Sequence, residues 1–94
     1  MLIRELAYDT DEDQLDLLID AFEPEEAEVV PLGDDIFLRR SIKTGKIVGA
    51  TVANYSLWQS GRHNLPKLEG ELSDSYLHIV RYLEIVKQKK AVVL

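Results

Sequence analysis

The sequence predicts an α+β fold in which an antiparallel sheet of four to five strands, built from two main hairpins, is packed by one C-terminal α-helix. Three observations predict it: a hairpin with a glycine turn over residues 36–56, alternating apolar and polar residues over 14–21, and an apolar stripe with helical spacing over 72–86. The 94 residues are expected to form one domain, because a chain of this length can bury only a single core.

The first hairpin is expected from two apolar segments, residues 2–8 and 14–21, which flank the acidic turn 9–13. In the second segment polar residues alternate with Leu15, Leu17, Ile19 and Ala21, as in a strand with one buried face. Asp9, Asp11 and Asp13 have the carboxylate spacing of a calcium loop, and Asp20 stands at its twelfth position. However, Gln14 occupies the place where such a loop needs glycine, so we interpret the aspartates as turn-forming residues.

An acidic connection over residues 22–28 leads to a short apolar segment from Glu28 to Leu32. Pro31 in this segment has no amide donor, which leaves two interpretations. The segment is either an edge strand or the start of a turn through residues 32–34.

The central hairpin has two possible registers, which differ in the loop around Gly45. In a two-residue loop of Thr44 and Gly45, Ile42 would lie opposite Ile47. In a three-residue loop with a bulge and a left-handed Gly45, Ile42 opposes Lys46, and the pairs beyond are Leu38 with Ala50 and Ile36 with Val52.

We favour the second register because it gathers aliphatic side chains on one face, with Arg40 at the rim: Ile36, Leu38, Val48, Ala50 and Val52. The other face then carries Phe37, Arg39, Ser41, Ile47, Thr51, Ala53 and Tyr55. Four of these form the candidate partner face: Phe37, Arg39, Ile47 and Tyr55.

Beyond the sheet core of residues 1–56, residues 57–70 are interpreted as a loop with one short helical turn, capped by Ser56 and closed by Gly61. A helix is predicted over residues 71–90, with Ser73 as its N-cap and an apolar stripe formed by Leu72, Tyr76, Ile79, Val80, Leu83 and Val86. The apolar tail, residues 91–94, either frays or orders against another chain.

The net charge of −6 is unevenly distributed. Residues 1–35 hold 13 acidic residues and one basic residue, Arg4, whereas residues 36–68 hold six basic residues and no acid. Acidic and basic strands that lie side by side would partly neutralise each other. Alternatively, one sign stays exposed and steers a partner. The candidate acidic patch consists of Asp9, Asp11, Glu12 and Asp13.

Few residues suggest catalysis or a cofactor. The chain has no cysteine, and its histidines, His63 and His78, lack the spacing of a metal pair. Arg62 and His63 near Trp58 form a small polar cluster that we do not interpret as an active site. We expect no enzyme, metal, cofactor or small-molecule substrate. No apolar run approaches the roughly 20 residues that span a bilayer, so a cytoplasmic protein is expected, without a membrane partner.

Two segments carry a family resemblance. Residues 8–15, Tyr-Asp-Thr-Asp-Glu-Asp-Gln-Leu, match a Tyr-Asp-x-x-x-Asp-x-Leu opening, and residues 45–54 resemble a Gly-x-Ile-Val-Gly-Ile-x-Ile-x-Asn strand. These motifs are similar to those of a small bacterial domain-of-unknown-function family. Ala50, Ala53 and the long extension after Ser56 depart from its pattern. The resemblance implies a compact β-sheet domain and no catalytic residues to carry over. Some members of the family look like the antitoxin half of two-gene modules, whose other half resembles a small ribonuclease toxin.

The leading hypothesis is therefore a non-enzymatic protein-interaction domain, antitoxin-like, whose acidic first hairpin faces a basic partner. One alternative is nucleic-acid binding through the basic segment 36–68, with Phe37, Tyr55 or Trp58 as stacking surfaces. The acidic total charge disfavours that alternative, because phosphate is repelled. Another alternative is a homodimer formed through the mixed face of the central hairpin.

Overall fold

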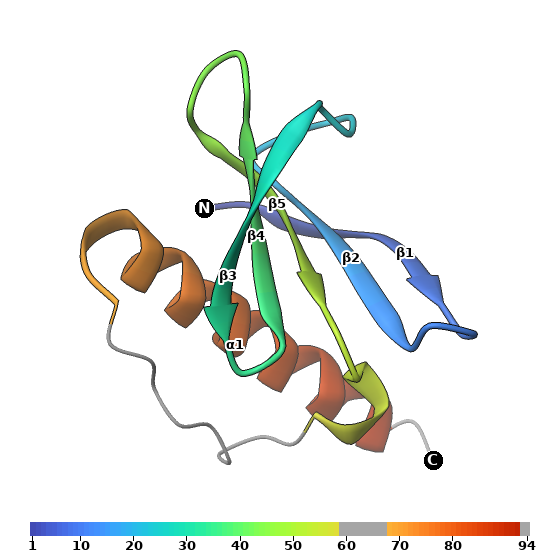
Figure 1. Cartoon of the computed structure of the whole chain (residues 1–94). Helices are drawn as coiled ribbons and strands as arrows, with labels where there is room; N and C mark the ends of the chain where they lie inside the picture. The colour runs from blue at the N-terminus through green and yellow to red at the C-terminus, as the bar shows by residue number, and fades with distance from the viewer. Residues whose placement is uncertain (59–67, 93–94) are drawn as a thin grey trace.

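The predicted α+β architecture is confirmed in the computed structural model, which describes residues 1–58 and 68–92. The described residues form β1 (Ile3–Asp9), β2 (Gln14–Ile19), β3 (Ala27–Gly33), β4 (Ile36–Ser41), β5 (Ile47–Val52), the 3-10 turn η1 (Tyr55–Leu57) and α1 (Gly70–Val92). The strands form one sheet in the order β1-β2-β5-β4-β3, with every neighbouring pair antiparallel (Figure 1).

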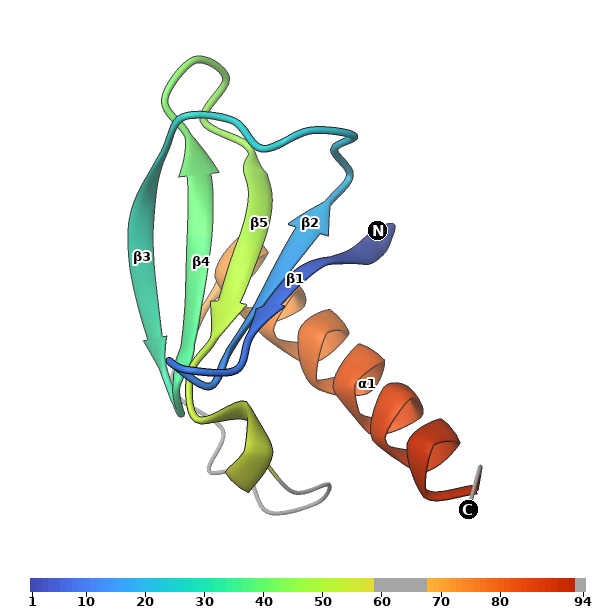
Figure 2. The same cartoon turned by 90° about the vertical axis from the view of Figure 1, so that its right-hand side faces the viewer.

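The helix α1 lies against one face of the sheet, and the other face is left open (Figure 2). Between the two layers lies the core, to which the strands contribute Leu15, Leu17, Ile19, Leu32, Ile36, Leu38, Ile47, Ala50 and Val52. The predicted helical stripe faces this core through Tyr76, Ile79 and Leu83, each at most 1% exposed. No helix among the described residues is long and apolar enough to cross a membrane.

The predicted boundaries of the helix need one correction. The helix begins at Gly70 and not after Ser73, so Ser73 lies within its first turns and is not the N-cap. At the far end, α1 extends through Val92, into the segment predicted as a tail. The predicted turn over residues 57–60 is replaced by η1, and its second half lies outside the described residues.

The register of the central hairpin is confirmed in its first half and differs in its second. Ile36 pairs with Val52 and Leu38 with Ala50, as expected. Between Arg39 and Arg40 the register then shifts, because Val48 is a bulge residue without a partner. The hairpin closes through a hydrogen bond from the Ser41 amide to the Lys46 carbonyl at 2.8 Å, around a four-residue loop with Gly45 at φ 72°.

The bulge reverses two side chains relative to the prediction. Ile47 now belongs to the core, and Val48 is turned to the open face, because one extra residue in a strand moves the following side chains to the other side. Both residues are aliphatic, so the hydrophobic pattern stays regular across the shift.

Of the two interpretations for the segment around Pro31, the edge strand is confirmed. β3 pairs only with β4, and its Pro31 lies opposite Phe37. Two aspartates, Asp34 and Asp35, connect β3 to β4 with φ angles of 54° and 61°. Positive φ at both central residues is the conformation that gives a two-residue turn the twist of its flanking strands.

Candidate interaction surface

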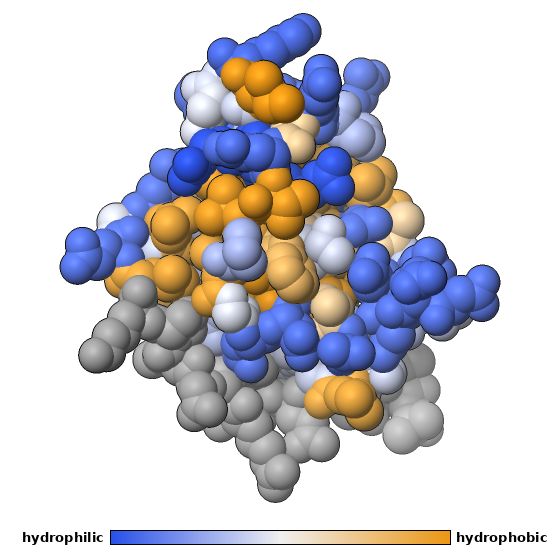
Figure 3. Space-filling model, in the orientation of Figure 1, coloured by the Kyte–Doolittle hydropathy of each residue, from blue (hydrophilic) through white to orange (hydrophobic). Residues whose placement is uncertain are grey.

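Among the described residues, no helix covers the face of the sheet opposite α1 (Figure 2). The strand pairings place two rows of side chains across it: Val29, Arg39, Gly49, Leu18 and Arg4 in the first, and Pro31, Phe37, Thr51, Asp16 and Ala7 in the second. In the space-filling view hydrophobic side chains gather over the middle of the molecule, with hydrophilic ones around them (Figure 3). We call the face opposite α1 the open face.

A shallow hollow of about 110 Å³ lies within the open face. Its apolar wall includes Leu6, which is 46% exposed, and the buried side chains of Leu18 and Val48, at 7% and 8% exposure. Its polar wall includes Asp16 and Arg39. Leu6 and Val48 are the unpaired residues at the register shifts in β1 and in β5. The bulges therefore turn two aliphatic side chains toward the solvent-facing side of the sheet.

Gly49 forms part of the floor of this hollow. A Cβ atom at this position would lie 2.8 Å from the Leu17 carbonyl oxygen, closer than van der Waals contact allows. The same Cβ would lie 3.4 Å from Cδ of Arg39 on the neighbouring strand. The absence of a side chain thus lets β2 and β5 pair closely and lets the Arg39 stem lie across β5.

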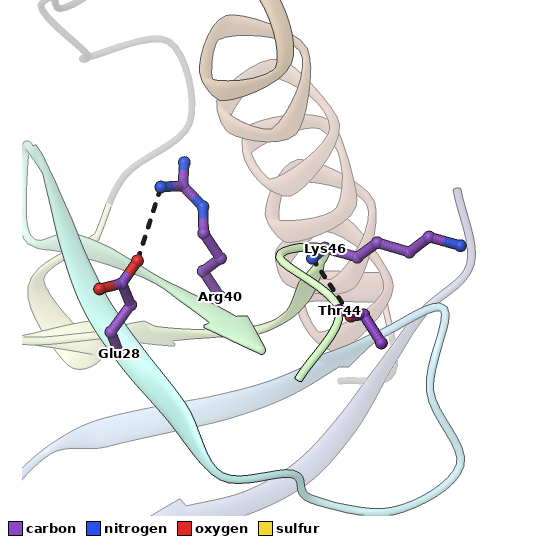
Figure 4. Close-up of polar contacts among 4 residues, drawn as sticks. All are labelled: Glu28, Arg40, Thr44 and Lys46. Carbon is purple, nitrogen blue, oxygen red and sulfur yellow. Dashed lines mark hydrogen bonds and ion pairs between the residues drawn. The ribbon is translucent and has the colours of Figure 1, made fainter. Parts of the chain in front are cut away.

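Two polar groups are fixed on this face in different ways. The Thr51 hydroxyl donates a hydrogen bond to Asp16 Oδ1 at 2.8 Å, which joins β5 to β2. Half-buried Arg39 makes neither a hydrogen bond nor an ion pair with any described residue. Its neighbour Arg40, one position along the strand, forms an ion pair with Glu28 at 3.6 Å (Figure 4).

The four residues of the candidate partner face do not lie on one face of the sheet. Phe37 and Arg39 lie on the open face, but Ile47 and Tyr55 are buried in the core, at 6% and 5% exposure. The bulge at Val48 accounts for Ile47. Tyr55 leaves the strand alternation because the sheet ends at Val52 and Asn54 takes a left-handed conformation with φ 51°, which starts η1.

The sequence reasoning missed Leu6, Leu18 and Val48. A signal existed for Leu18, because three consecutive apolar residues, Leu17, Leu18 and Ile19, indicate a strand with apolar groups on both faces. No comparable signal marks Leu6 or Val48, whose direction depends on the bulges.

The acidic patch is a turn held together by its own carboxylates. Asp9 Oδ1 accepts hydrogen bonds from the amides of Asp11 and Glu12, at 3.0 and 3.2 Å. Asp20, the fourth aspartate of the calcium spacing, is at the other end of β2, where its Oδ1 accepts the Leu2 amide at 2.7 Å. The calcium ligands therefore do not assemble, and no group of three metal-binding side chains is found in the described part of the chain.

Asp13 joins this turn to η1 and α1. Its carboxylate accepts hydrogen bonds from the Tyr8 hydroxyl at 2.6 Å and from the Ser56 hydroxyl, also at 2.6 Å. The Tyr8 ring packs edge-on against Tyr55, and Lys87 Nζ lies 4.3 Å from the centroid of the Tyr55 ring. We call these five residues the Asp13 cluster.

The hydrogen bonds set the ionisation of the Asp13 cluster. The bond from the Ser56 hydroxyl, followed by the bond from Tyr8, lowers the pKa of Asp13. The bond to Asp13 in turn raises the pKa of Tyr8, because its hydroxyl donates to a carboxylate. At neutral pH the cluster thus holds a carboxylate and a protonated phenol.

The basic segment 36–68 is dispersed over the described structure. Lys43 and Lys46 lie in the loop between β4 and β5, where the Lys46 amide donates to the Thr44 hydroxyl at 3.3 Å (Figure 4). Arg39 lies on the open face and Arg40 is paired with Glu28. Tyr55 and Trp58, two of the proposed stacking residues, are buried. Arg62 and His63 lie outside the described residues.

Comparison with known proteins gave no match to a family model, a curated protein or a solved structure. What the structure defines is a class: an α+β domain whose antiparallel sheet has one face covered by a helix and one face open.

Proposed function

We propose that this chain is a non-enzymatic protein-interaction domain that binds through its open face. The observation that carries this proposal is an apolar surface, with a hollow, on the side of the sheet that α1 does not cover. Exposed apolar patches with polar borders are typical of protein contact sites. A half-buried arginine at the centre is also typical, because arginine is enriched in contact surfaces.

The ionisation of the Asp13 cluster supports a role without catalysis. A general base needs a pKa near the working pH, and the Asp13 pKa is shifted away from neutrality. The Tyr8 pKa is shifted upward, which disfavours its use as a nucleophile or base. Asp13 accepts hydrogen bonds from Tyr8 of β1 and from Ser56 of η1, which indicates a role in joining the first hairpin to η1.

The charge distribution favours a basic partner. The turns after β1 and after β3 lie at the same end of the sheet, and together they contain Asp9, Asp11, Glu12, Asp13, Asp34 and Asp35 (Figure 1). Such a cluster of negative potential would steer a basic protein toward the domain. This fits an antitoxin-like role in the bacterial cytoplasm, the role that the family resemblance implies.

The open face can be tested with two matched leucines. Leu6, at 46% exposure, lies in the hollow, and Leu77, at 49% exposure, lies on α1. Each is replaced by lysine, and the tagged protein is co-expressed with the protein encoded beside it in its genome. We expect Leu6→Lys to reduce co-purification at least about tenfold and Leu77→Lys to leave it near the wild-type amount. Equal recovery with both variants, or no recovery with the wild type, would contradict the proposal.

A further inference from the structure

We infer that the partner on the open face is a second copy of this chain, related by a two-fold axis that lies parallel to the sheet, above the part of β5 between Gly49 and Thr51. This inference rests on the proposed function, since it names the occupant of the same surface. It is carried by the charges on that surface, by their positions relative to β5, and by the size of the face.

The open face is close to neutral in a chain whose net charge is −6. Arg4, the one basic residue among the first 35, lies in the first row of this face, and Arg39 lies in the same row. Asp16 and Glu25 line its hollow. Two copies of an acidic chain repel each other least where cations and carboxylates are balanced, so this face is suited to self-association.

Arg39 and Asp16 are placed symmetrically about β5. Arg39 lies on β4 opposite Gly49, and Asp16 lies on β2 opposite Thr51. A two-fold axis above this point, in the plane between the two sheets and perpendicular to the line from Arg39 to Asp16, therefore brings Arg39 of each copy against Asp16 of the other. Such an isologous contact forms every pair twice, and it gives Arg39 the ion pair that no described residue of its own chain supplies.

The open face is large enough for a dimer interface only if all of it takes part. Five strands about 4.8 Å apart, with about six residues each at about 3.3 Å, give a projected area of roughly 480 Å². Phe22, which is 87% exposed beside Arg4, and Val29, which is 60% exposed on β3, extend the apolar surface at both edges. A stable dimer buries about 800 Å² per partner. The projected area of the face is smaller than this, so the whole open face would take part, together with the side chains at its edges.

The decisive experiment exchanges the two charges. Arg39→Asp and Asp16→Arg each place like charges together across the axis, whereas the double variant restores two opposite pairs with reversed sign. By sedimentation equilibrium we expect wild-type protein to be dimeric at about 100 μM, each single variant to raise the dimer Kd at least about tenfold, and the double variant to return it to within about threefold. Thermal unfolding of each variant shows whether it is folded.

A second measurement does not depend on these charges. The chain has no cysteine, so an introduced thiol reports on one position only. Thr51→Cys lies beside the proposed axis, where the two sulfur atoms can approach within disulfide range, and Leu77→Cys on α1 is the matched control. Under mild oxidation we expect a covalent dimer to form quickly with Thr51→Cys and only slowly with Leu77→Cys. Oxidised glutathione should react faster with the thiol of Leu77→Cys than with the thiol of Thr51→Cys, because the dimer covers position 51.

Several results would overturn the inference. Wild-type protein that stays monomeric at about 100 μM does so directly. So does a double variant no better than the single variants, or equal cross-linking at Thr51→Cys and Leu77→Cys. The wild-type chain could be monomeric while Leu6→Lys still reduces co-purification of the co-encoded partner. That result would leave the proposed function intact and exclude the second copy as the occupant. A dimer that cross-links at Thr51→Cys supports the second copy as the occupant of the open face.

Discussion

Single hydrogen-bonded side chains hold the turns of this domain against its helical elements, and Asp13 is the best connected of them. It joins the β1–β2 turn to η1 through Tyr8 and Ser56. Its φ of 54° also gives the turn its left-handed step into β2. Because the chain returns to Asp13 43 residues later at Ser56, this one carboxylate links parts of the sequence that periodicity alone does not connect.

The first prediction concerns the pH dependence of this link. The Asp13 pKa is lowered in the folded protein, so its contribution to the free energy of unfolding is present above the unfolded pKa of about 4. It is lost as the pH falls through the folded pKa. The difference in unfolding free energy between wild type and Asp13→Asn should therefore shrink as urea titrations move from pH 6 to pH 3. Asp11→Asn removes the same charge from the same turn and should keep the wild-type profile. A constant difference for Asp13→Asn would contradict this role.

The second prediction concerns Tyr76, the residue of α1 that contacts the β3–β4 turn. Its hydroxyl donates to Asp34 Oδ2 at 2.9 Å, and burial followed by this bond raises its pKa to about 12. We expect Tyr76→Phe to lower the free energy of unfolding by about 1–2 kcal/mol at neutral pH. In the wild type the phenol stays protonated longer in the folded state, so stability falls as the pH rises from about 10 to 12. Denaturation of the phenylalanine variant should lack most of this alkaline loss; an unchanged loss would assign it to other groups.

At the scale of elements, the strands and the helix could be predicted from the sequence because each has a clear period. The alternation in β2 and the stripe on α1 both mark the sides that meet in the core. The bulges could not be predicted. A bulge moves the side chains that follow it to the other face of the sheet. Ile47 and Val48 exchange faces in this way, and because both are aliphatic the hydrophobic pattern of the sequence does not reveal the exchange. The hollow of the open face, which depends on Val48 and Leu6, was hidden for that reason.

The third prediction tests the close pairing of β2 and β5. Gly49→Ala places a methyl group 2.8 Å from the Leu17 carbonyl oxygen, so the two strands must separate or shift. We expect a loss of about 1–3 kcal/mol in unfolding free energy, measured by urea denaturation. Amide exchange should increase most in the ladder between β2 and β5.

Gly45→Ala is a useful comparison for this variant. Its φ of 72° is unfavourable for alanine, but nothing lies within 4 Å of the new Cβ atom. It should cost about 1 kcal/mol through backbone strain, with faster exchange confined to the β4–β5 loop. If amide exchange increased at the same positions in both variants, the close approach at Gly49 would not be the cause of the faster exchange in Gly49→Ala.

At the scale of the whole molecule, two layers share one core, and neither layer can bury its apolar side without the other. The inner side chains of the sheet pack with Tyr76, Ile79 and Leu83 of α1. Tyr55 and Trp58 complete the core at η1. The sequence predicted this arrangement in outline, since a chain of this length has only one way to cover both elements. The partner of the open face could not be predicted in the same way, because an alternating strand with a mixed outer face is compatible with solvent or with a protein.

The last prediction follows from this shared core. Trp58 is the only tryptophan and is 8% exposed, so its emission reports on the junction of η1 with the core, whereas circular dichroism at 222 nm reports mainly on α1. We expect both signals to change at one urea midpoint, because loss of either layer exposes the core of the other. A helix that unfolded first, with tryptophan emission unchanged, would show that α1 does not stabilise the sheet. If two copies associate through the open face, the shared midpoint should also rise with protein concentration, because a dimer is stabilised by mass action.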